Sequence, residues 1–260
     1  MKMEETKLMM DDSIKINTKD PVIEITKLCK AFGTQQVLKD LSLKLFNGEN
    51  LVVLGKSGSG KSVLIKCIAG LLKSDSGIIN VFQHDVTALK VKELDEVRRD
   101  IGFLFQSGAL YDSMTVKENL EFPLIRLKKL LTKKQRDEKI EEVLENVGLS
   151  DALHKMPSQL SGGMRKRISL ARTIIVDPKI MLYDEPTTGL DPVTSDEISL
   201  LINDIQKKYK TSSIIITHDI ECARATADRL IMLQDGQIYA DGNIDNYEKS
   251  TDSVIKSFFK

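Results

Sequence analysis

The sequence has few cysteines, no net charge and no long apolar run, and each absence excludes a class of protein. Its 3 cysteines are scattered without C-x-x-C spacing, which argues against a disulfide framework or a zinc site and fits a reducing compartment. Lys and Arg number 38 and so do Asp and Glu, so the overall basic charge typical of nucleic-acid-binding proteins is missing. No apolar run approaches the roughly 20 residues that cross a bilayer, so in any membrane process another chain must span the membrane.

The sequence alternates short apolar segments with amphipathic ones, which is typical of an α/β fold. Residues 22–45 hold strand-like segments, and the apolar run LVVLG then precedes the helical pattern KSVLIKCIAGLL. Thr132 and Gln135 predict a capping box ahead of a charged helix. Further along, KIMLYDEP and SSIIITHD are continuous apolar runs on either side of another helical pattern. Such strands, alternating with helices and closed by a hairpin at Asp235-Gly236, predict a mostly parallel sheet covered on both faces.

Three parts of the chain are expected. Residues 1–21 carry acidic residues throughout and no apolar core segment, so we expect a short, flexible lead-in rather than a secretory signal. Residues 22–242 are predicted to form one α/β domain, into which residues from about 107 to 175 insert as a helical subdomain. Residues 243–260 are too few for a second domain and are predicted to form a helical tail.

A glycine-rich stretch, GKSGSGKS, joins an apolar strand to a helix. It satisfies G-x-x-x-x-G-K-[ST], in which glycines let successive backbone N–H groups turn toward phosphate oxygens. The strand before it and the helix after it are the context that a phosphate-binding loop requires. We expect Lys61 to reach the β- and γ-phosphates and the Ser62 hydroxyl to bind Mg²⁺. The candidate nucleotide-binding residues of this loop are Gly55, Lys56, Ser57, Gly58, Ser59, Gly60, Lys61, Ser62 and Val63.

Two acidic residues, Asp184 and Glu185, end the apolar run IMLY. Mg²⁺ takes hard oxygen ligands, so Asp184 is placed to hold the ion, or one of its waters, opposite Ser62. Glu185 is expected to point elsewhere and to accept a proton from the attacking water as a general base. Lys61 and Glu185 are therefore candidate catalytic residues. A strand that ends at a solvated acidic turn is the alternative, and the phosphate-binding loop argues against it.

The motifs GKSGSGKS, FQS, LSGG, LYDEPTTGLDP and THD occur in the order and spacing of an ATP-binding cassette (ABC) ATPase, and the chain resembles that family from about residue 22 to residue 242. The resemblance implies ATP and Mg²⁺ as cofactors and ATP hydrolysis as the reaction. It also implies the ABC ATPase fold, which is a P-loop NTPase core with a mostly parallel sheet, an N-terminal antiparallel β region and an inserted helical subdomain.

The resemblance assigns roles to four further residues. Phe32 is expected to stack on the adenine, although a core aromatic is the alternative. Gln106 is expected to sense the γ-phosphate and bind Mg²⁺, and His218 to contact the γ-phosphate as a catalytic residue. Each of these two ends an apolar strand, at the sheet edge where ligands gather in open α/β folds. Asp191 is expected to lie in a loop that communicates across a dimer.

The stretch LSGGMRKR is a second glycine-rich stretch that one nucleotide does not need. In the ABC family this motif contacts ATP held by the neighbouring subunit, which implies a head-to-tail homodimer. The residues expected to serve the partner's ATP are Ser161, Gly162, Gly163 and Asp191. Met164 stands where the family commonly has glutamine, and a methionine donates no hydrogen bond to ATP. The following Arg165, Lys166 and Arg167 are interpreted as a solvated basic face of a helix, with direct phosphate contact as the alternative.

A polytopic membrane permease is the partner that the resemblance favours, because the chain has one cassette and no long coiled coil. Leu110, Tyr111 and Met114 are suited to a groove for a permease helix, with core packing as the alternative. FQSGALYDSMTV together with LSGGM resembles the ATPase of Mce/Mla-type phospholipid transport systems, which implies an Mce-type lipid-binding subunit as a further partner. The chain is then expected on the cytoplasmic face of the cell membrane, with no nucleic-acid partner. An amino-acid or small-solute importer, or a soluble ABC ATPase acting on DNA or ribosomes, are the alternatives.

Overall fold

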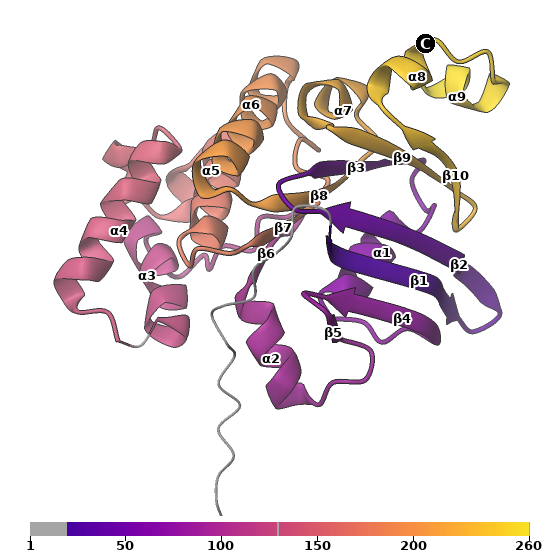
Figure 1. Cartoon of the computed structure of the whole chain (residues 1–260). Coiled ribbons are helices and arrows are strands. Elements are labelled where there is room, and N and C mark those ends of the chain that lie inside the picture. The colour runs from indigo at the N-terminus through magenta and orange to yellow at the C-terminus, as the bar shows by residue number, and fades with distance from the viewer. Residues whose placement is uncertain (1–19, 129, 260) are drawn as a thin grey trace, which may run out of the picture.

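Two β-sheets and a helical lobe make up the computed structural model, which describes residues 20–128 and 130–259 (Figure 1). The lead-in expected at residues 1–21 lies almost entirely outside these described residues. In the two described ranges, no helix combines the length and the apolar character that crossing a bilayer requires.

The larger sheet has the strand order β10-β9-β3-β8-β7-β6. Its strands are β3 (Asn50–Leu54), β6 (Ile101–Leu104), β7 (Ile180–Asp184), β8 (Ser212–Thr217), β9 (Arg229–Gln234) and β10 (Gln237–Gly242). The pairs β9/β3, β3/β8, β8/β7 and β7/β6 are parallel, and β10 joins β9 through an antiparallel hairpin. Every residue of β3, β7 and β8 is buried, as their continuous apolar sequences predict. The mostly parallel sheet and its closing hairpin are confirmed.

The smaller sheet is antiparallel, with the order β2-β1-β4-β5. Its strands are β1 (Pro21–Phe32), β2 (Gln35–Phe46), β4 (Ser76–Val81) and β5 (His84–Asp85). In Figure 1 it lies beside the parallel sheet, with α1 (Lys61–Ile68) between the two. The expected antiparallel region near the N-terminus is therefore confirmed.

Alternate residues of β3 face two different hydrophobic cores. Leu51 and Val53 pack in a core with apolar residues of α1 and of the antiparallel sheet. Val52 and Leu54 pack in the other core, which also contains apolar residues of the helical lobe. Successive side chains of a strand point to opposite faces, so both faces of the parallel sheet are covered.

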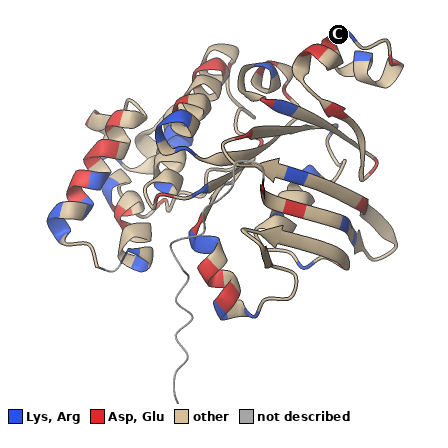
Figure 2. Cartoon of the chain, in the orientation of Figure 1, with Lys and Arg blue, Asp and Glu red and all other residues tan. Residues whose placement is uncertain are grey.

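The helical lobe lies at one end of the parallel sheet (Figure 1). Its elements are α3 (Val116–Leu127), α4 (Lys133–Asn146), η1 (Ser150–Ala152), η2 (Pro157–Gln159) and α5 (Gly162–Ile174). The capping box at the start of α4 is confirmed, because the backbone N–H of Gln135 donates to Oγ1 of Thr132 at 3.3 Å and that of Thr132 donates to Oε1 of Gln135 at 2.8 Å. Basic and acidic residues are interspersed over the lobe and both sheets (Figure 2).

The remaining helices follow the strands of the two sheets. They are α2 (Val91–Arg99), α6 (Pro192–Tyr209), α7 (Ile220–Thr226), α8 (Ile244–Glu248) and α9 (Ser253–Phe258). The last two fall in the range expected for a helical tail. Tyr247 of α8 is buried, and its hydroxyl donates to the carbonyl of Leu230 at 3.0 Å, which fixes α8 against β9.

Candidate active site

The loop GKSGSGKS runs from the carboxyl end of β3 into the first turn of α1, as the sequence predicts. Two of its positions require glycine. A Cβ on Gly55 would lie 2.5 Å from the carbonyl oxygen of Leu233. Gly60 caps α1 with φ of 104°, and a Cβ there would lie 2.9 Å from the carbonyl oxygen of Val37. The loop thus passes close to two other backbones in a conformation that side chains would block.

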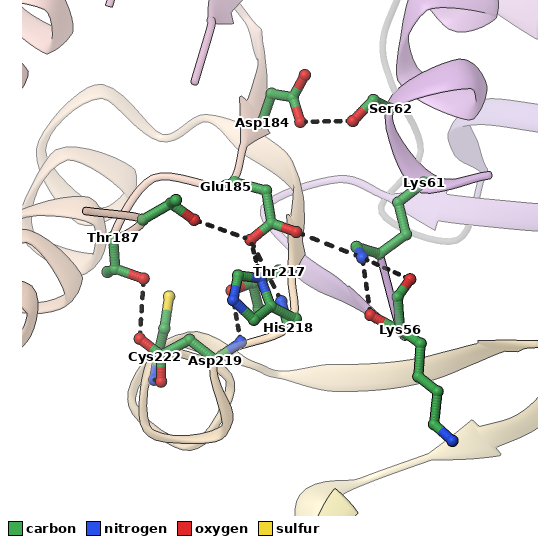
Figure 3. Close-up of polar contacts among 12 residues, drawn as sticks. Lys56, Lys61, Ser62, Asp184, Glu185, Thr187, Thr217, His218, Asp219 and Cys222 are labelled. Atoms are coloured by element: carbon green, nitrogen blue, oxygen red, sulfur yellow. Dashed lines mark hydrogen bonds and ion pairs between the residues drawn. The ribbon is translucent and has the colours of Figure 1, made fainter. Parts of the chain in front are cut away.

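Lys61, the first residue of α1, is buried at 5% exposure. Its Nζ donates to the carbonyl of Gly55 at 2.7 Å and to that of Lys56 at 3.2 Å (Figure 3). The same nitrogen lies 3.3 Å from Oε1 of Glu185. The ammonium is therefore held inside the loop, where its charge acts on any phosphate that the loop binds.

Ser62 and Asp184 come from different elements and meet at the edge of the parallel sheet. The Ser62 hydroxyl, in the first turn of α1, donates to Oδ1 of Asp184 at the end of β7, at 2.8 Å (Figure 3). A hydroxyl and a carboxylate are hard oxygen donors of the kind that Mg²⁺ prefers. The pair fits the chemistry of the Mg²⁺ site that the sequence predicts.

Glu185 turns away from Asp184, because its backbone leaves the strand with φ of 50°. This left-handed conformation costs a non-glycine residue about 1–3 kcal/mol and persists only where the surroundings hold it. Here its N–H donates to the carbonyl of Ile216 at 2.9 Å. Its Oε2 accepts from the hydroxyl of Thr188 at 3.3 Å. The two neighbouring carboxylates thus face different partners (Figure 3).

His218 directly follows β8 and contacts the same carboxylate. Its Nδ1 lies 2.8 Å from Oε2 of Glu185, and its backbone N–H donates to that oxygen at 3.3 Å. Glu185 is 8% exposed, whereas the His218 side chain is 58% exposed. The geometry therefore joins a buried carboxylate to an imidazole that faces the solvent side of the site.

A second contact between the same two loops was not expected from the sequence. The Thr187 hydroxyl donates to Oδ2 of Asp219 at 2.8 Å, and Asp219 also caps α7 (Figure 3). This bond ties the turn after β7 to the turn after β8, so it supports the placement of Glu185 and His218. Threonine and aspartate at these positions are ordinary turn residues, and no local sequence signal indicates the pairing.

One cavity of about 460 Å³ brings nine of the predicted residues together. It is lined by Ser57, Gly58, Gly60, Lys61, Ser62, Val63, Gln106, Glu185 and His218 and by Val37, which the sequence did not indicate. Lys56 and Ser59 line a neighbouring cavity of about 600 Å³ together with residues of α9.

Phe32 is not a core aromatic, because it is 50% exposed at the end of β1. Its ring lies 5.4 Å from Nζ of Lys30. Phe32 is not among the residues that line the 460 Å³ cavity, so stacking on adenine stays a prediction.

The residues expected to serve a partner's ATP lie together but do not line this cavity. Ser161 caps α5, and its hydroxyl accepts from the N–H of Met164 at 3.2 Å. Asp191 caps α6 through Thr194, whose hydroxyl and N–H hold the pKa of this carboxyl below its ordinary value. Thr194 also reaches Gly163, because a Cβ on that glycine would lie 2.5 Å from Cγ2 of Thr194. The starts of α5 and α6 therefore form one surface.

The basic stretch after Met164 is not uniformly solvated, so that interpretation was wrong for Lys166. Arg165 is exposed, but Lys166 is 6% exposed and its Nζ donates to the carbonyl of Gln106 at 2.8 Å. Burial lowers the pKa of Lys166, and the charges of Asp184 and Glu185 oppose that shift. The helical spacing of α5 indicates this burial, because Lys166 lies one turn before the buried Leu170 and therefore on the same face of the helix.

The residues considered for a permease groove divide between core and surface. Leu110 packs against the core of the lobe, whereas Tyr111 is 42% exposed. The Tyr111 ring meets Phe122 edge-on at 5.2 Å, and the guanidinium of Arg172 lies 4.9 Å from its centre. Core packing thus accounts for Leu110, and Tyr111 offers an aromatic surface.

Known proteins match this chain in both sequence and structure. The sequence profile of the family described as ABC transporter matches residues 38–188. The methionine import ATP-binding protein MetN of Rhizobium johnstonii is 39% identical over 227 residues, which cover 86% of this chain and 62% of MetN. The probable ribonucleotide transport ATP-binding protein mkl of Mycobacterium leprae is 39% identical over 236 residues, which cover 91% of this chain and 68% of mkl. The chain thus spans about two thirds or less of the length of these relatives.

A solved structure extends the similarity to the whole cassette. The dimer of the ATP-binding cassette MJ0796 in a post-hydrolysis state, bound to ADP and Pi, has a TM-score of 0.78 and 31% identity and covers 85% of this chain and 98% of that one. These matches agree with the observed fold of two sheets and a helical lobe. They also agree with the site, in which Asp184, Glu185 and His218 lie beside the phosphate-binding loop. The chain therefore belongs to the ABC transporter family and carries the ATPase domain of that family in its characteristic fold.

Proposed function

We propose that this chain is the ATP-hydrolysing subunit of a membrane transporter. The observation that carries the proposal is the position of Glu185, whose carboxylate lies between Lys61 and His218 and beside the Ser62–Asp184 pair. A buried carboxylate next to a phosphate-binding loop is suited to take a proton from water as that water attacks the γ-phosphate.

Each charged group of the site has a separate task in this mechanism. The loop N–H groups and Lys61 bind the phosphates, and the Lys61 ammonium balances negative charge that develops in the transition state. Ser62, Asp184 and the Gln106 side chain would hold Mg²⁺, which supplies charge neutralisation at the β- and γ-phosphates when bound. Glu185 takes the proton, and His218 orients the Glu185 carboxylate through Nδ1. Phe32 is proposed to stack on the adenine.

The site is proposed to be completed by a second copy of the chain in a head-to-tail dimer. Ser161, Gly162 and Asp191 are exposed and Gly163 is half-buried, and none of the four lines the cavity of their own phosphate-binding loop. In the proposed dimer this surface contacts the ATP held by the partner. The dimeric state of MJ0796 supports this arrangement.

The proposed transporter moves phospholipid through a polytopic permease, with an Mce-type lipid-binding subunit as a further partner, and it holds this chain at the cytoplasmic face of the membrane. The support is the stretch FQSGALYDSMTV together with LSGGM, which resembles ATPases of Mce/Mla-type systems. Methionine import is the second candidate, because MetN is 39% identical over 86% of this chain.

Purification with the membrane partners tests the proposal. We expect the tagged chain, extracted in mild detergent, to bring down a polytopic protein with bound phospholipid that mass spectrometry identifies. Its ATP hydrolysis should require Mg²⁺ and should rise in phospholipid nanodiscs. If the purified complex retains methionine and methionine stimulates its ATP hydrolysis, the cargo is methionine and not lipid. A purified chain that binds no ATP would refute the whole proposal.

A further inference from the structure

Lys166 is a buried cation that the proposed mechanism does not use. Its side chain is enclosed at 6% exposure, and its Nζ donates to the backbone carbonyl of Gln106 at 2.8 Å. Burying a charged group costs free energy unless hydrogen bonds compensate it. An apolar side chain could fill this place without the free-energy cost of burying a charge. The bond from Lys166 to Gln106 therefore calls for a functional explanation.

Three residues on one face of α5 contact the segment that begins at Gln106. Lys166 bonds to the carbonyl of Gln106. Ser169, one turn later, packs closely on Gly108, because a Cβ added to Gly108 would lie 2.5 Å from Oγ of Ser169. Arg172, one turn further, donates to the carbonyl of Ala109 at 3.1 Å. These residues are spaced by three along the helix, which places them on one side.

The segment is also held by a residue of α3. Asn119 is fully buried, and its side-chain amide donates to the carbonyls of Tyr111 and Met114 at 3.1 and 3.0 Å. Its Oδ1 accepts from the N–H of Tyr111 at 2.8 Å. The stretch after β6 is therefore bound to the helical lobe, and Gln106 at its start is one of the residues that line the 460 Å³ cavity.

The same helix starts at the residues proposed to contact the partner's ATP. Lys166 lies about one turn after Gly162, and the α5 backbone between them is continuous. A change in the direction of α5 therefore moves both the partner-facing end and the bond to Gln106.

We propose that Lys166 is a positioning residue that fixes Gln106 to α5, so that the Gln106 amide meets Mg²⁺-ATP only when α5 is oriented toward the partner's nucleotide. This inference rests on the proposed ATPase function. It makes the bond between Lys166 and Gln106 a link between the two ATP sites of the dimer. Removing the bond weakens the use of Mg²⁺ and leaves the phosphate-binding loop intact.

Substitution of Lys166 tests this link. Lys166→Met and Lys166→Gln remove the ammonium, Lys166→Arg keeps a cation, and Lys207→Met removes a lysine from the exposed end of α6 as the matched control. We expect both removal variants to need roughly tenfold more Mg²⁺ for half-maximal ATP hydrolysis, the change that follows loss of one charge-assisted hydrogen bond. Binding of a fluorescent ATP analogue without metal should stay within about twofold of wild type, and Lys166→Arg should recover most of the loss.

A double-mutant cycle with Gln106→Ala separates positioning from a purely structural role. If Lys166 acts through Gln106, Lys166→Met adds less than about twofold to the effect of Gln106→Ala. The inference would be overturned if the effects of Lys166→Met and Gln106→Ala on the Mg²⁺ requirement multiply in the double variant. It would also be overturned if the removal variants need no more Mg²⁺ than wild type. If the Met variant does not fold in a thermal melt, the Gln variant is used in the cycle. A wild-type chain without Mg²⁺-dependent hydrolysis would instead refute the proposed function.

Discussion

Replacing Glu185 with glutamine is the sharpest test of the proposed chemistry. Glutamine has nearly the same shape and keeps an oxygen acceptor for the N–H of His218, which lies 3.3 Å from the carboxylate. It cannot take up the proton of an attacking water. If Glu185 is the general base, we expect kcat to fall about 10²–10⁴-fold, which corresponds to about 2.7–5.5 kcal/mol of transition-state stabilisation.

ATP binding should survive this change. Lys61 loses an ion pair of 3.3 Å but keeps the carbonyls of Gly55 and Lys56 at 2.7 and 3.2 Å, so the ammonium stays in the loop. With hydrolysis blocked, Glu185→Gln should accumulate as an ATP-bound dimer. The variant Glu142→Gln, at a side chain of α4 that is 53% exposed, makes the same chemical change away from the site.

Single-turnover phosphate release and light scattering in the presence of Mg²⁺-ATP measure the two effects. The expected result is slow release together with a doubled mass for Glu185→Gln, and wild-type behaviour for Glu142→Gln. Phosphate release by Glu185→Gln within about twofold of wild type would refute the assignment of the base, because a 10²-fold effect is the lower limit expected for proton transfer.

Three further substitutions probe the other parts of the site. Lys61→Ala should raise the dissociation constant of a fluorescent ATP analogue at least roughly 100-fold, since several charge-assisted bonds depend on it; unchanged binding would contradict the assignment of the loop. Ser161→Gly lowers the stability of the α5 N-cap by only a few tenths of a kcal/mol, so ATP binding by the monomer should be unchanged. In the Glu185→Gln background it should weaken the ATP-bound dimer about tenfold, as measured by analytical ultracentrifugation. Thr132→Ala removes the capping box of α4 and should lower the free energy of unfolding by about 0.5–2 kcal/mol in urea titrations without changing kcat; a fall in kcat at full occupancy would show that the lobe affects the chemistry more directly than proposed.

The fold and the phosphate-binding loop are predictable because their signals are local. The loop pattern, the apolar strand before Gly55 and the acidic pair at the end of β7 all lie within short stretches of sequence. The divergent directions of Asp184 and Glu185 also follow from the sequence, although the left-handed φ of 50° that produces them does not.

What the sequence does not predict depends on residues brought together from distant positions. The Thr187–Asp219 bond joins turns after two different strands, and each turn looks ordinary by itself. The basic stretch from Arg165 to Arg167 predicts a solvated face, yet Lys166 is buried, and its carbonyl partner lies 60 residues earlier in the chain. The helical spacing of α5 indicates the burial, but only the packing of α5 on the segment after β6 identifies the carbonyl partner.

The core that lies on the lobe side of β3 limits how far the helical lobe can be treated as a separate module. Val52 and Leu54 of β3 share that core with Val116 and Leu120 of α3 and with Ile140 of α4. A shortened chain without residues 107–175 would expose to water the part of this sheet face that α6 and α7 do not cover, and large exposed apolar patches promote aggregation. Exchange of the lobe between related chains would therefore have to preserve its inner apolar face as well as the exposed residues proposed to contact the partner's ATP.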